Sequence, residues 1–293
     1  MNRVLLRFTL SHWQSTRSLT TAASSSINAE EVSKFAAASA EWWNPHGQFG
    51  MLHKMNPPRT KYIRDQVLKH LNPTLFPPSA TPAHPFKGLR ILDVGCGGGL
   101  LSESLARLGA TVTGLDASPE NTAMATYHVS LDPSLSPPPT FLAEPIEHHL
   151  QNTQQKYDVV TSLEVIEHVN NPATFLKHCL QSVKPGGVAV FSTINRTRTS
   201  WLLTILAAEH VLKWVPVGTH DHAKYITPEE LEGFVKGSGE NVQVVDVRGI
   251  AYRVLENRWE VLGSEADKKA LGNSLGFGDL EMNYIVTVTK GME

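Results

Sequence analysis

The sequence predicts an α/β fold in which a mostly parallel sheet carries helices on both faces. Two observations lead to this prediction. Short apolar runs alternate with stretches of helical periodicity between residues 89 and 193, and such alternation is typical of parallel sheets. A glycine-rich turn follows the first of these runs, which is where doubly wound sheets bind nucleosides. With 293 residues, the chain is long enough to bury a full core.

The first 29 residues have the composition of a mitochondrial transit segment. They include Arg3, Arg7 and Arg17 and many serines and threonines, and the first acidic residue is Glu30. The apolar run at 4–6 is too short for a secretory signal. We therefore expect a disordered transit segment over 1–29, with an untargeted disordered tail as the alternative.

Residues 30–70 predict an N-terminal helical lid in two pieces. Apolar side chains recur at helical spacing over 31–43, and the sequence NPHG at 44–47 then interrupts the helix. A second helix is predicted to begin after Pro57 and Pro58, because a helix tolerates proline at its first positions. Five prolines between 72 and 88 indicate a loop that leads to the sheet.

The sheet is expected to form from strands and helices in alternation. The expected strands are 89–94, 111–115, 141–142, 157–162 and 188–193, and the helices between them are 99–108, 119–129 and 172–183. Two further apolar runs, at 242–247 and 284–288, predict late strands.

The turn at 93–99 reads DVGCGGG and is predicted to bind a nucleoside. Glycines such as Gly95 and Gly97 let the backbone approach a ligand closely, and Asp116, at the end of the next strand, can accept hydrogen bonds from ribose hydroxyls. The dinucleotide pattern fails, because positions 100 and 102 carry Leu and Ser, and this disfavours an NAD-dependent oxidoreductase. Asp93 instead makes the turn similar to motif I of S-adenosylmethionine-dependent methyltransferases. A glycine turn without a ligand is the alternative.

A second candidate site follows the predicted strand 157–162. If residues 163–168 (LEVIEH) turn helically, Glu164, Glu167 and His168 fall on one face of the turn. Two carboxylates and an imidazole could hold Mg²⁺ or a transition metal. Alternatively, these side chains cap helix ends or hydrogen-bond the substrate without a metal. His168, if it is not a ligand, could act as a general base.

Arg59 lies in the stretch MNPPRTKYI, where its guanidinium could clamp a carboxylate through two hydrogen bonds. The methionine part of S-adenosylmethionine carries such a carboxylate. The alternative is a solvated arginine at a helix start, where the helix dipole disfavours a cation.

An apolar insertion is expected over 196–222. Within it, Glu209 and Lys213 are the only charged side chains of the stretch 200–217. Exposed apolar surface marks partner or membrane sites, and Trp201 and Trp214 suit a lipid headgroup interface. The alternative is a buried helix that covers the active site. In either arrangement the insertion could line a path for an apolar substrate.

Composition argues against several other classes. The net charge is −2, so the chain lacks the excess of positive charge that nucleic acid binding requires, and we expect no nucleic acid partner. The two cysteines, Cys96 and Cys179, imply no disulfide framework and fit a reducing compartment. Because the sequence contains no run of 18 apolar residues, we expect no transmembrane helix.

Beyond residue 30 the sequence resembles the ubiquinone-biosynthesis O-methyltransferases, which act on hexaprenyldihydroxybenzoate and 3-demethylubiquinol. The glycine turn and the KPGG turn at 184–187 occur in many methyltransferases. Trp42 and Trp43 followed by LHKMNPPR, and the THD stretch at 219–221, are more specific. The proline-rich loops at 72–85 and 132–139 look like insertions relative to compact members of that family.

The resemblance implies a Rossmann-like class I S-adenosylmethionine-dependent methyltransferase over 30–293, with a mostly parallel seven-stranded sheet that ends in an antiparallel hairpin. The implied reaction is O-methylation of catechol hydroxyls on polyprenylated ubiquinone precursors. These precursors are 3,4-dihydroxy-5-polyprenylbenzoate and 3-demethylubiquinol. Arg59 would bind the cofactor's methionine carboxylate, Asp116 would bind its ribose, and Gly95, Gly97 and Leu163 would line its site.

The resemblance also implies that Mg²⁺ is bound by Glu164, Glu167 and His168. It further implies a peripheral position on the matrix side of the inner mitochondrial membrane, within a ubiquinone-synthesis protein complex. Two rival hypotheses stay open, since a fold does not fix a function. One is a C- or N-methyltransferase on the same fold, and the other is a non-catalytic scaffold of that complex. Cofactor binding and the identity of the methylated atom distinguish them.

Overall fold

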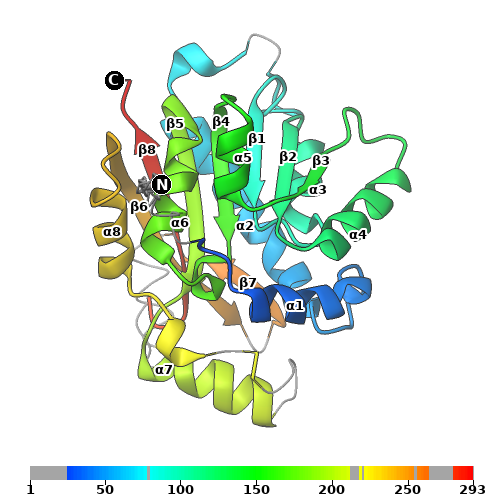
Figure 1. Cartoon of the computed structure of the whole chain (residues 1–293), viewed down its shortest axis with the longest axis vertical. Helices are drawn as coiled ribbons and strands as arrows, with labels where there is room; N and C mark the ends of the chain where they lie inside the picture. Colours follow the sequence, from blue (N-terminus) through cyan, green and yellow to red (C-terminus); the bar gives the residue numbers. More distant parts are fainter. Residues whose placement is uncertain are drawn as a thin grey trace, which may run out of the picture.

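The computed structural model describes residues 25–77, 80–211, 218–219, 221–253, 256–263 and 280–292. In this part of the chain, eight strands form one sheet in the order β3-β2-β1-β4-β5-β8-β6-β7 (Figure 1). In chain order the strands are β1 (Arg90–Val94), β2 (Thr111–Asp116), β3 (Thr140–Ala143), β4 (Tyr157–Leu163), β5 (Val183–Ile194), β6 (Val242–Arg253), β7 (Arg258–Val261) and β8 (Asn283–Lys290).

The predicted mostly parallel sheet is confirmed. β1 pairs in parallel with β2 and β4, and β3 and β5 extend the parallel pairing on either side. β8 and β6 then join in antiparallel orientation. The expected count of seven strands is wrong, because β7 adds an eighth. β6 continues beyond its last pairing with β8 at Ile250, and its remaining backbone groups pair with β7 instead.

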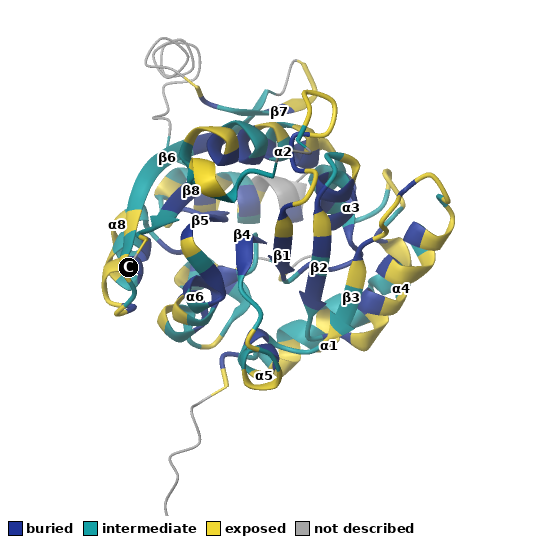
Figure 2. Cartoon of the chain, turned by 90° about the horizontal axis from the view of Figure 1, so that it is seen from above, coloured by how far each residue is buried: buried dark blue, intermediate teal, exposed yellow. Residues whose placement is uncertain are grey.

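Helices cover both faces of the sheet, and their outer surfaces carry most of the exposed residues (Figure 2). α2 and α3 pack on one face, and α5, α6 and α8 pack on the other. The helices are α1 (Ala29–Ala37), α2 (Gly50–His70), α3 (Leu100–Arg107), α4 (Pro119–Ser130), α5 (Ile146–Asn152), α6 (Pro172–Gln181), α7 (Arg198–Ser200) and α8 (Pro228–Lys236). The remaining helical segments are the 3₁₀ turns η1 (Ser39–Glu41), η2 (Pro73–Leu75), η3 (Ile166–His168) and η5 (His222–Lys224), and the π-helix η4 (Trp201–Val211).

The second helix of the predicted lid starts earlier than the prolines indicate. α2 begins at Gly50, so Pro57 and Pro58 lie inside it. Each proline removes one backbone donor and would ordinarily end a helix. Here Met55 and Arg59, on either side of the pair, are both buried. We attribute the continuous helix to this packing, which outweighs the local preference for a break.

The N-terminal boundary of the fold also differs from its prediction. Residues 25–29 belong to the fold, because Ser26 is buried and its N–H donates to the carboxylate of Glu147 at 2.9 Å. The Ser26 carbonyl in turn accepts from the N–H of Asn170. α1 is shorter than the predicted helix over 31–43, and η1 follows it. Residues 1–24 of the expected transit segment, and 212–217 and 220 of the insertion, lie outside the described residues.

Candidate active site

A pocket lies at the carboxyl ends of β1, β2 and β4, the edge at which parallel sheets bind ligands. α1, drawn in blue, lies across this edge of the sheet (Figure 1). Five of the predicted site residues line the pocket, namely Gly95, Gly97, Asp116, Glu164 and His168. The three that do not line it are Arg59, Leu163 and Glu167.

The glycine turn leaves no space for side chains. Gly95 and Gly97 have φ values of 75° and 53°, a region that L-residues rarely adopt. A Cβ atom on Gly95 would lie 2.4 Å from Cγ2 of Val165, and one on Gly97 would lie 2.3 Å from Cζ2 of Trp42. The indole ring of Trp42 therefore fills the space beside the turn, and the protein's own side chains require glycine at both positions.

The carboxylate of Asp116 lies at the end of β2 and is fixed by three donors. Its Oδ2 accepts the N–H of Gly97 at 2.9 Å, and its Oδ1 accepts the N–H of Ser118 at 2.9 Å. Asn121 donates its amide to Oδ1 at 3.2 Å and accepts the indole N–H of Trp42 at 2.9 Å. Burial raises the pKa of Asp116, although the hydrogen bonds oppose this effect. Oδ1 accepts two of these donors and Oδ2 accepts one, so Oδ2 can still accept a donor from a ligand.

Asp93, the acid of the predicted motif, faces the core and does not line the pocket. Its carboxylate accepts hydrogen bonds from the hydroxyls of Ser102 at 2.6 Å and Thr161 at 3.0 Å. Burial raises its pKa. The role that the geometry supports is structural, since these bonds connect β1 to α3 and β4.

Arg59 is buried in the middle of α2, so the alternative of a solvated arginine at a helix start is wrong. Its Nη1 lies 4.0 Å from Oε1 of Glu164, and its Nε has no hydrogen-bond partner among the described residues. Burial lowers the pKa of Arg59, while the charges of Glu164 and Asp93 raise it. A buried guanidinium with an unpaired N–H fits a ligand that carries a carboxylate.

The segment after β4 does not form the helical face that the spacing predicts. Glu164 has a φ of 58°, so the chain turns sharply after Leu163, the last residue of β4. The carboxylate of Glu164 accepts hydrogen bonds from the hydroxyl of Ser192 at 2.6 Å and the amide of Asn283 at 2.7 Å. Glu164 is thereby tied to β5 and β8.

Glu167 and His168 follow in η3 and have different partners. The buried carboxylate of Glu167 accepts the hydroxyl of Thr193 at 2.8 Å. His168 Nδ1 lies 3.0 Å from a carboxylate oxygen of Glu31 in α1. Burial, reinforced by the charge of Glu164, raises the pKa of Glu167 to about 7. Burial disfavours the charged imidazole of His168, but the hydrogen bond with Glu31 and the charge of Glu167 outweigh it and raise its pKa.

The predicted metal-binding group is therefore not assembled in this structure. Glu164, Glu167 and His168 are each held by a different neighbour, because the positive φ of Glu164 breaks the helical spacing on which the prediction rested. No group of three or more His, Cys, Asp or Glu side chains within the described ranges could hold a metal ion. As arranged here, these residues do not fit a bound Mg²⁺.

Comparison with known proteins identifies the family. A model of the methyltransferase domain matches residues 59–244. The chain is 41% identical over 267 residues to a ubiquinone biosynthesis O-methyltransferase of Cereibacter sphaeroides. The aligned residues cover 91% of this chain and 98% of that relative. It is 40% identical over 282 residues to the mitochondrial ubiquinone biosynthesis O-methyltransferase of Arabidopsis thaliana, with 96% and 80% covered. The chain belongs to the ubiquinone biosynthesis O-methyltransferases.

Solved structures agree with this methyltransferase fold. The magnesium protoporphyrin IX methyltransferase from Synechocystis, with bound SAH, superposes with a TM-score of 0.56 at 16% identity and covers 88% of this chain and 95% of its own. A plantazolicin methyltransferase in complex with SAH gives a TM-score of 0.51 at 17% identity, with 89% and 98% covered. The predicted fold class, the recognised family and the assignment as an S-adenosylmethionine-dependent methyltransferase are confirmed.

The buried carboxyl of this O-methyltransferase at Glu167 leads to a pH-dependent prediction for stability. Its pKa of about 7 exceeds the ordinary value of 4.5, so the folded state holds the proton more tightly than the unfolded state does. Stability should therefore fall as the pH rises from about 4.5 through about 7. Glu167→Gln removes this loss, and we expect it to raise the free energy of unfolding by about 3 kcal/mol at pH 8 and by almost nothing at pH 4.

Urea unfolding at both pH values measures this effect. Glu30→Gln is the matched control, because Glu30 is exposed and its replacement should change stability at neither pH. An equal effect of Glu167→Gln at the two pH values would contradict the burial argument.

Three residues around the site escaped the sequence analysis. Glu31 contacts His168 across 137 positions of sequence, and Asn121 connects Trp42 to Asp116. Lys224 lies 3.2 Å from Glu31. Of the partners in these contacts, Trp42, Asp116 and His168 were singled out from the sequence. The other contacts depend on how distant segments pack, which no local pattern reports.

Proposed function

We propose that this O-methyltransferase methylates a catechol hydroxyl on a polyprenylated ubiquinone precursor, with S-adenosylmethionine as the methyl donor. The proposed acceptors are 3,4-dihydroxy-5-polyprenylbenzoate and 3-demethylubiquinol. The observation that carries this proposal is one pocket that holds the glycine turn and Asp116 together with His168, beneath α1. The names of the bacterial and plant relatives support a ubiquinone precursor as the substrate.

The cofactor is proposed to bind along the carboxyl edge of the sheet. Arg59 pairs with the methionine carboxylate, and its unpaired Nε supports this role. Asp116 accepts hydrogen bonds from the ribose hydroxyls, Gly95 and Gly97 let the backbone approach, and Leu163 lines the site. S-adenosylmethionine, when bound there, supplies an electrophilic methyl group on a sulfonium.

His168 is the proposed general base for the acceptor hydroxyl. Its imidazole lines the pocket, and because Nδ1 is engaged by Glu31, Nε2 is the nitrogen available to take the proton. Val32, Phe35 and Val165 line the same pocket and limit the access of water. Since an anionic oxygen and a cationic sulfonium lose charge together in the transition state, a dry pocket favours the reaction.

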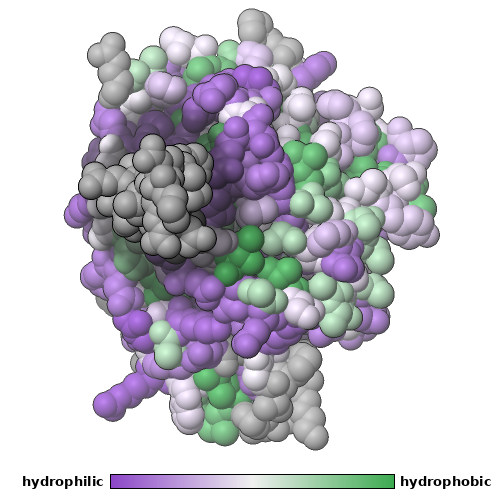
Figure 3. Space-filling model, viewed as in Figure 1, coloured by the Kyte–Doolittle hydropathy of each residue, from purple (hydrophilic) through white to green (hydrophobic). Residues whose placement is uncertain are grey.

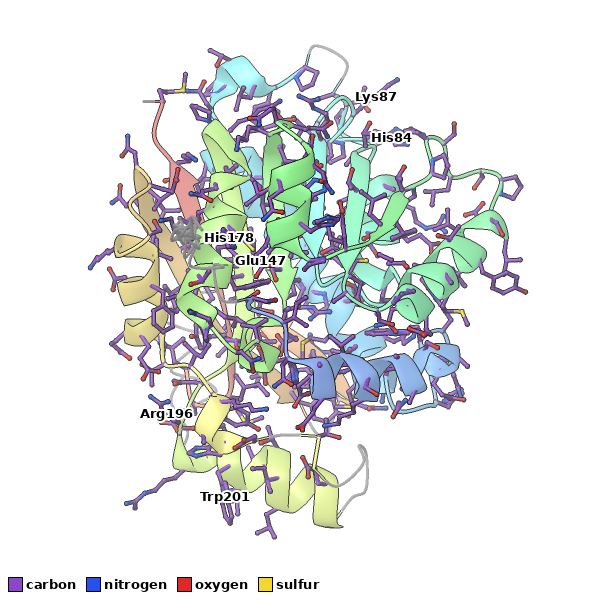
Figure 4. All side chains as sticks on the ribbon, in the orientation of Figure 1. His84, Lys87, Glu147, His178, Arg196 and Trp201 are labelled. Atoms are coloured by element: carbon purple, nitrogen blue, oxygen red, sulfur yellow. The ribbon has the colours of Figure 1, made fainter. Side chains whose placement is uncertain are left out.

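We propose that the first turns of η4 contact the inner mitochondrial membrane on its matrix side. Trp201, Leu202 and Leu206 are 45%, 43% and 40% exposed, and Trp201 points away from the body of the protein (Figure 4). Hydrophobic surface also gathers at this end of the molecule (Figure 3). A polyprenyl tail partitions into lipid, so a peripheral contact here would bring the acceptor to the enzyme. No described helix is both long and apolar enough to cross a bilayer.

We propose that the chain acts in the mitochondrion. The mitochondrial relative from Arabidopsis supports a mitochondrial location, with a transit segment that ends before Ser26, because residues 25–29 belong to the fold. We also propose that the chain works within a ubiquinone-synthesis protein complex. Import of a fusion of residues 1–29 to a fluorescent protein, together with affinity purification from mitochondria, tests both points.

The function is tested with the purified chain, labelled S-adenosylmethionine and a short-prenyl 3,4-dihydroxybenzoate. We expect transfer of the label to this catechol and none to an analogue in which both hydroxyls are already methylated. Cofactor binding without transfer to any catechol would overturn the acceptor assignment, and absence of cofactor binding would favour a scaffold.

A parallel incubation with a chelator tests the magnesium dependence that the family resemblance implies. Loss of product in the chelator, restored by added Mg²⁺, would support a metal site that assembles only with ligands bound. Product that persists in the chelator would remove the metal from the proposal and leave O-methylation intact.

A further inference from the structure

Ser26, Ile27 and Asn28 form a strap that lines part of the pocket. Asn170 holds the strap through two hydrogen bonds, since its backbone N–H donates to the carbonyl of Ser26 at 2.8 Å and its side-chain amide donates to the carbonyl of Ile27 at 2.7 Å. The N–H of Ser26 donates to Oε1 of Glu147 in α5 at 2.9 Å. The strap leads directly into α1, which Asn28 caps. Its position therefore affects the pocket and the helix that lies across it.

Two buried acceptors beside the strap have no donor among the described residues. One is Oε2 of Glu147, and the other is Nδ1 of His178 in α6. Nδ1 lies 4.0 Å from Oε1 of Glu147, and the two side chains lie close together (Figure 4). Burial lowers the pKa of His178, and a neutral imidazole has one nitrogen that can accept a hydrogen bond.

The carboxylate of Glu147 also lacks a cation. No described lysine or arginine forms an ion pair with it, and its one short hydrogen bond comes from a neutral backbone amide. Buried polar atoms without partners are rare in folded proteins, so this site fits a group with more donors than an amide has. An α-ammonium group at Ser26 would supply three N–H donors and a positive charge in place of a single N–H. The two added donors match the two acceptors that now lack one.

The exposure of the chain changes at the peptide bond that precedes this nitrogen. Ser25 is exposed, whereas Ser26 is 2% exposed. The hydroxyl of Ser25 accepts the exposed N–H of Ile27 at 3.2 Å, so removal of Ser25 costs the fold little. Residues 1–25 contain three arginines and no acidic residue, which is the composition of a removable transit segment.

We infer that a processing protease cleaves the chain between Ser25 and Ser26, and that Glu147 binds the new α-ammonium group of Ser26 and thereby fixes the strap in the pocket wall. Water adds its hydroxyl to the carbonyl carbon of Ser25, and the C–N bond breaks. The nitrogen keeps the other hydrogen of the water and takes up the proton of the new carboxylic acid. Cleavage precedes folding, because Ser26 is buried in the folded chain. The inference rests on the proposed mitochondrial location.

Three purified chains test the ammonium site, namely the uncleaved full chain, residues 26–293 with a free amine, and residues 26–293 with an acetylated amine. The acetylated chain is the matched control, because it keeps the amide N–H and lacks the charge. We expect the free chain to melt about 4 °C above the acetylated chain at pH 7, since an ion pair replaces a neutral hydrogen bond. The full chain should melt with the acetylated chain.

Glu147→Gln in the free and acetylated chains should remove this difference in melting temperature, because an amide does not pair with an ammonium group. Glu30→Gln, at an exposed position, should leave the difference unchanged. Isothermal titration should show that the free chain binds S-adenosylmethionine about fivefold more tightly than the acetylated chain, because a larger fraction of it holds the strap in place.

Import of the full chain into isolated mitochondria, followed by mass spectrometry of its N-terminus, locates the cleavage. We expect Ser26 as the first residue. A different first residue would overturn the inference, and so would equal melting temperatures of the free and acetylated chains. Failed import would instead contradict the mitochondrial location, and the comparison of the free and acetylated chains would then decide the ammonium site alone.

Discussion

Among Gly→Ala substitutions in the glycine turn, Gly97→Ala is expected to destabilise the fold and to weaken cofactor binding the most. The new Cβ would lie 2.3 Å from Cζ2 and 2.5 Å from Cη2 of Trp42. The indole has little freedom to move, because it stacks on Phe49 at 3.9 Å and donates to Asn121. The positive φ of 53° adds backbone strain. Together the overlap and the strain should cost about 3 kcal/mol.

Urea unfolding measures this loss, and isothermal titration with S-adenosylmethionine measures the weakened binding. Gly239→Ala is the matched control. Gly239 also has a positive φ, of 77°, but a Cβ there would meet nothing within 4 Å, so it carries the strain alone and should cost only about 1 kcal/mol. Adding Trp42→Leu to Gly97→Ala should return part of the stability. Equal losses for Gly97→Ala and Gly239→Ala would show that Trp42 does not constrain the turn.

Replacing Asp116 with asparagine is expected to lower the affinity for S-adenosylmethionine by about 100-fold. A carboxylate strengthens the hydrogen bond that it accepts from a ribose hydroxyl, and the loss of a bond to a charged group costs up to about 3 kcal/mol. The amide also presents a donor where Asp116 now accepts the N–H groups of Gly97 and Ser118. One of these backbone groups would lose its partner, which adds to the disorder of the turn.

Isothermal titration again provides the measurement. Asp132→Asn serves as the control, since Asp132 lies in the loop after α4 and contacts Arg107 and Ser134 away from the pocket. It should leave the affinity unchanged. If Asp116→Asn binds the cofactor as tightly as Asp132→Asn does, Asp116 does not recognise the ribose.

The sequence predicts those parts of the fold that depend on local signals. The apolar run at 157–162 becomes β4, and the glycines at 95 and 97 form the turn, because strand periodicity and positive φ are properties of neighbouring residues. α5, α8 and β7 were not predicted. α8 could have been found from the capping box at Thr227 and Glu230, which the structure contains.

The sequence fails where tertiary packing outweighs a local preference. Pro57 and Pro58 indicate a helix start, but buried neighbours on both sides carry α2 through them. A right-handed helix over 163–168 would require negative φ values. Hydrogen bonds from Ser192 and Asn283 instead hold Glu164 at a positive φ. The contact between Glu31 and His168 has no sequence signal at all, because it exists only when α1 lies across the sheet edge.

We expect the enzyme to place a methyl group on a catechol oxygen. This outcome is tested most directly by incubating the chain with S-adenosylmethionine labelled with ¹³C in the methyl group and a short-prenyl 3,4-dihydroxybenzoate, and recording the ¹³C spectrum of the product. We expect the labelled carbon to resonate as an aromatic methoxy group, with none of it as a ring-bound methyl carbon. A labelled methyl group attached to a ring carbon would contradict the account and identify a C-methyltransferase on the same fold.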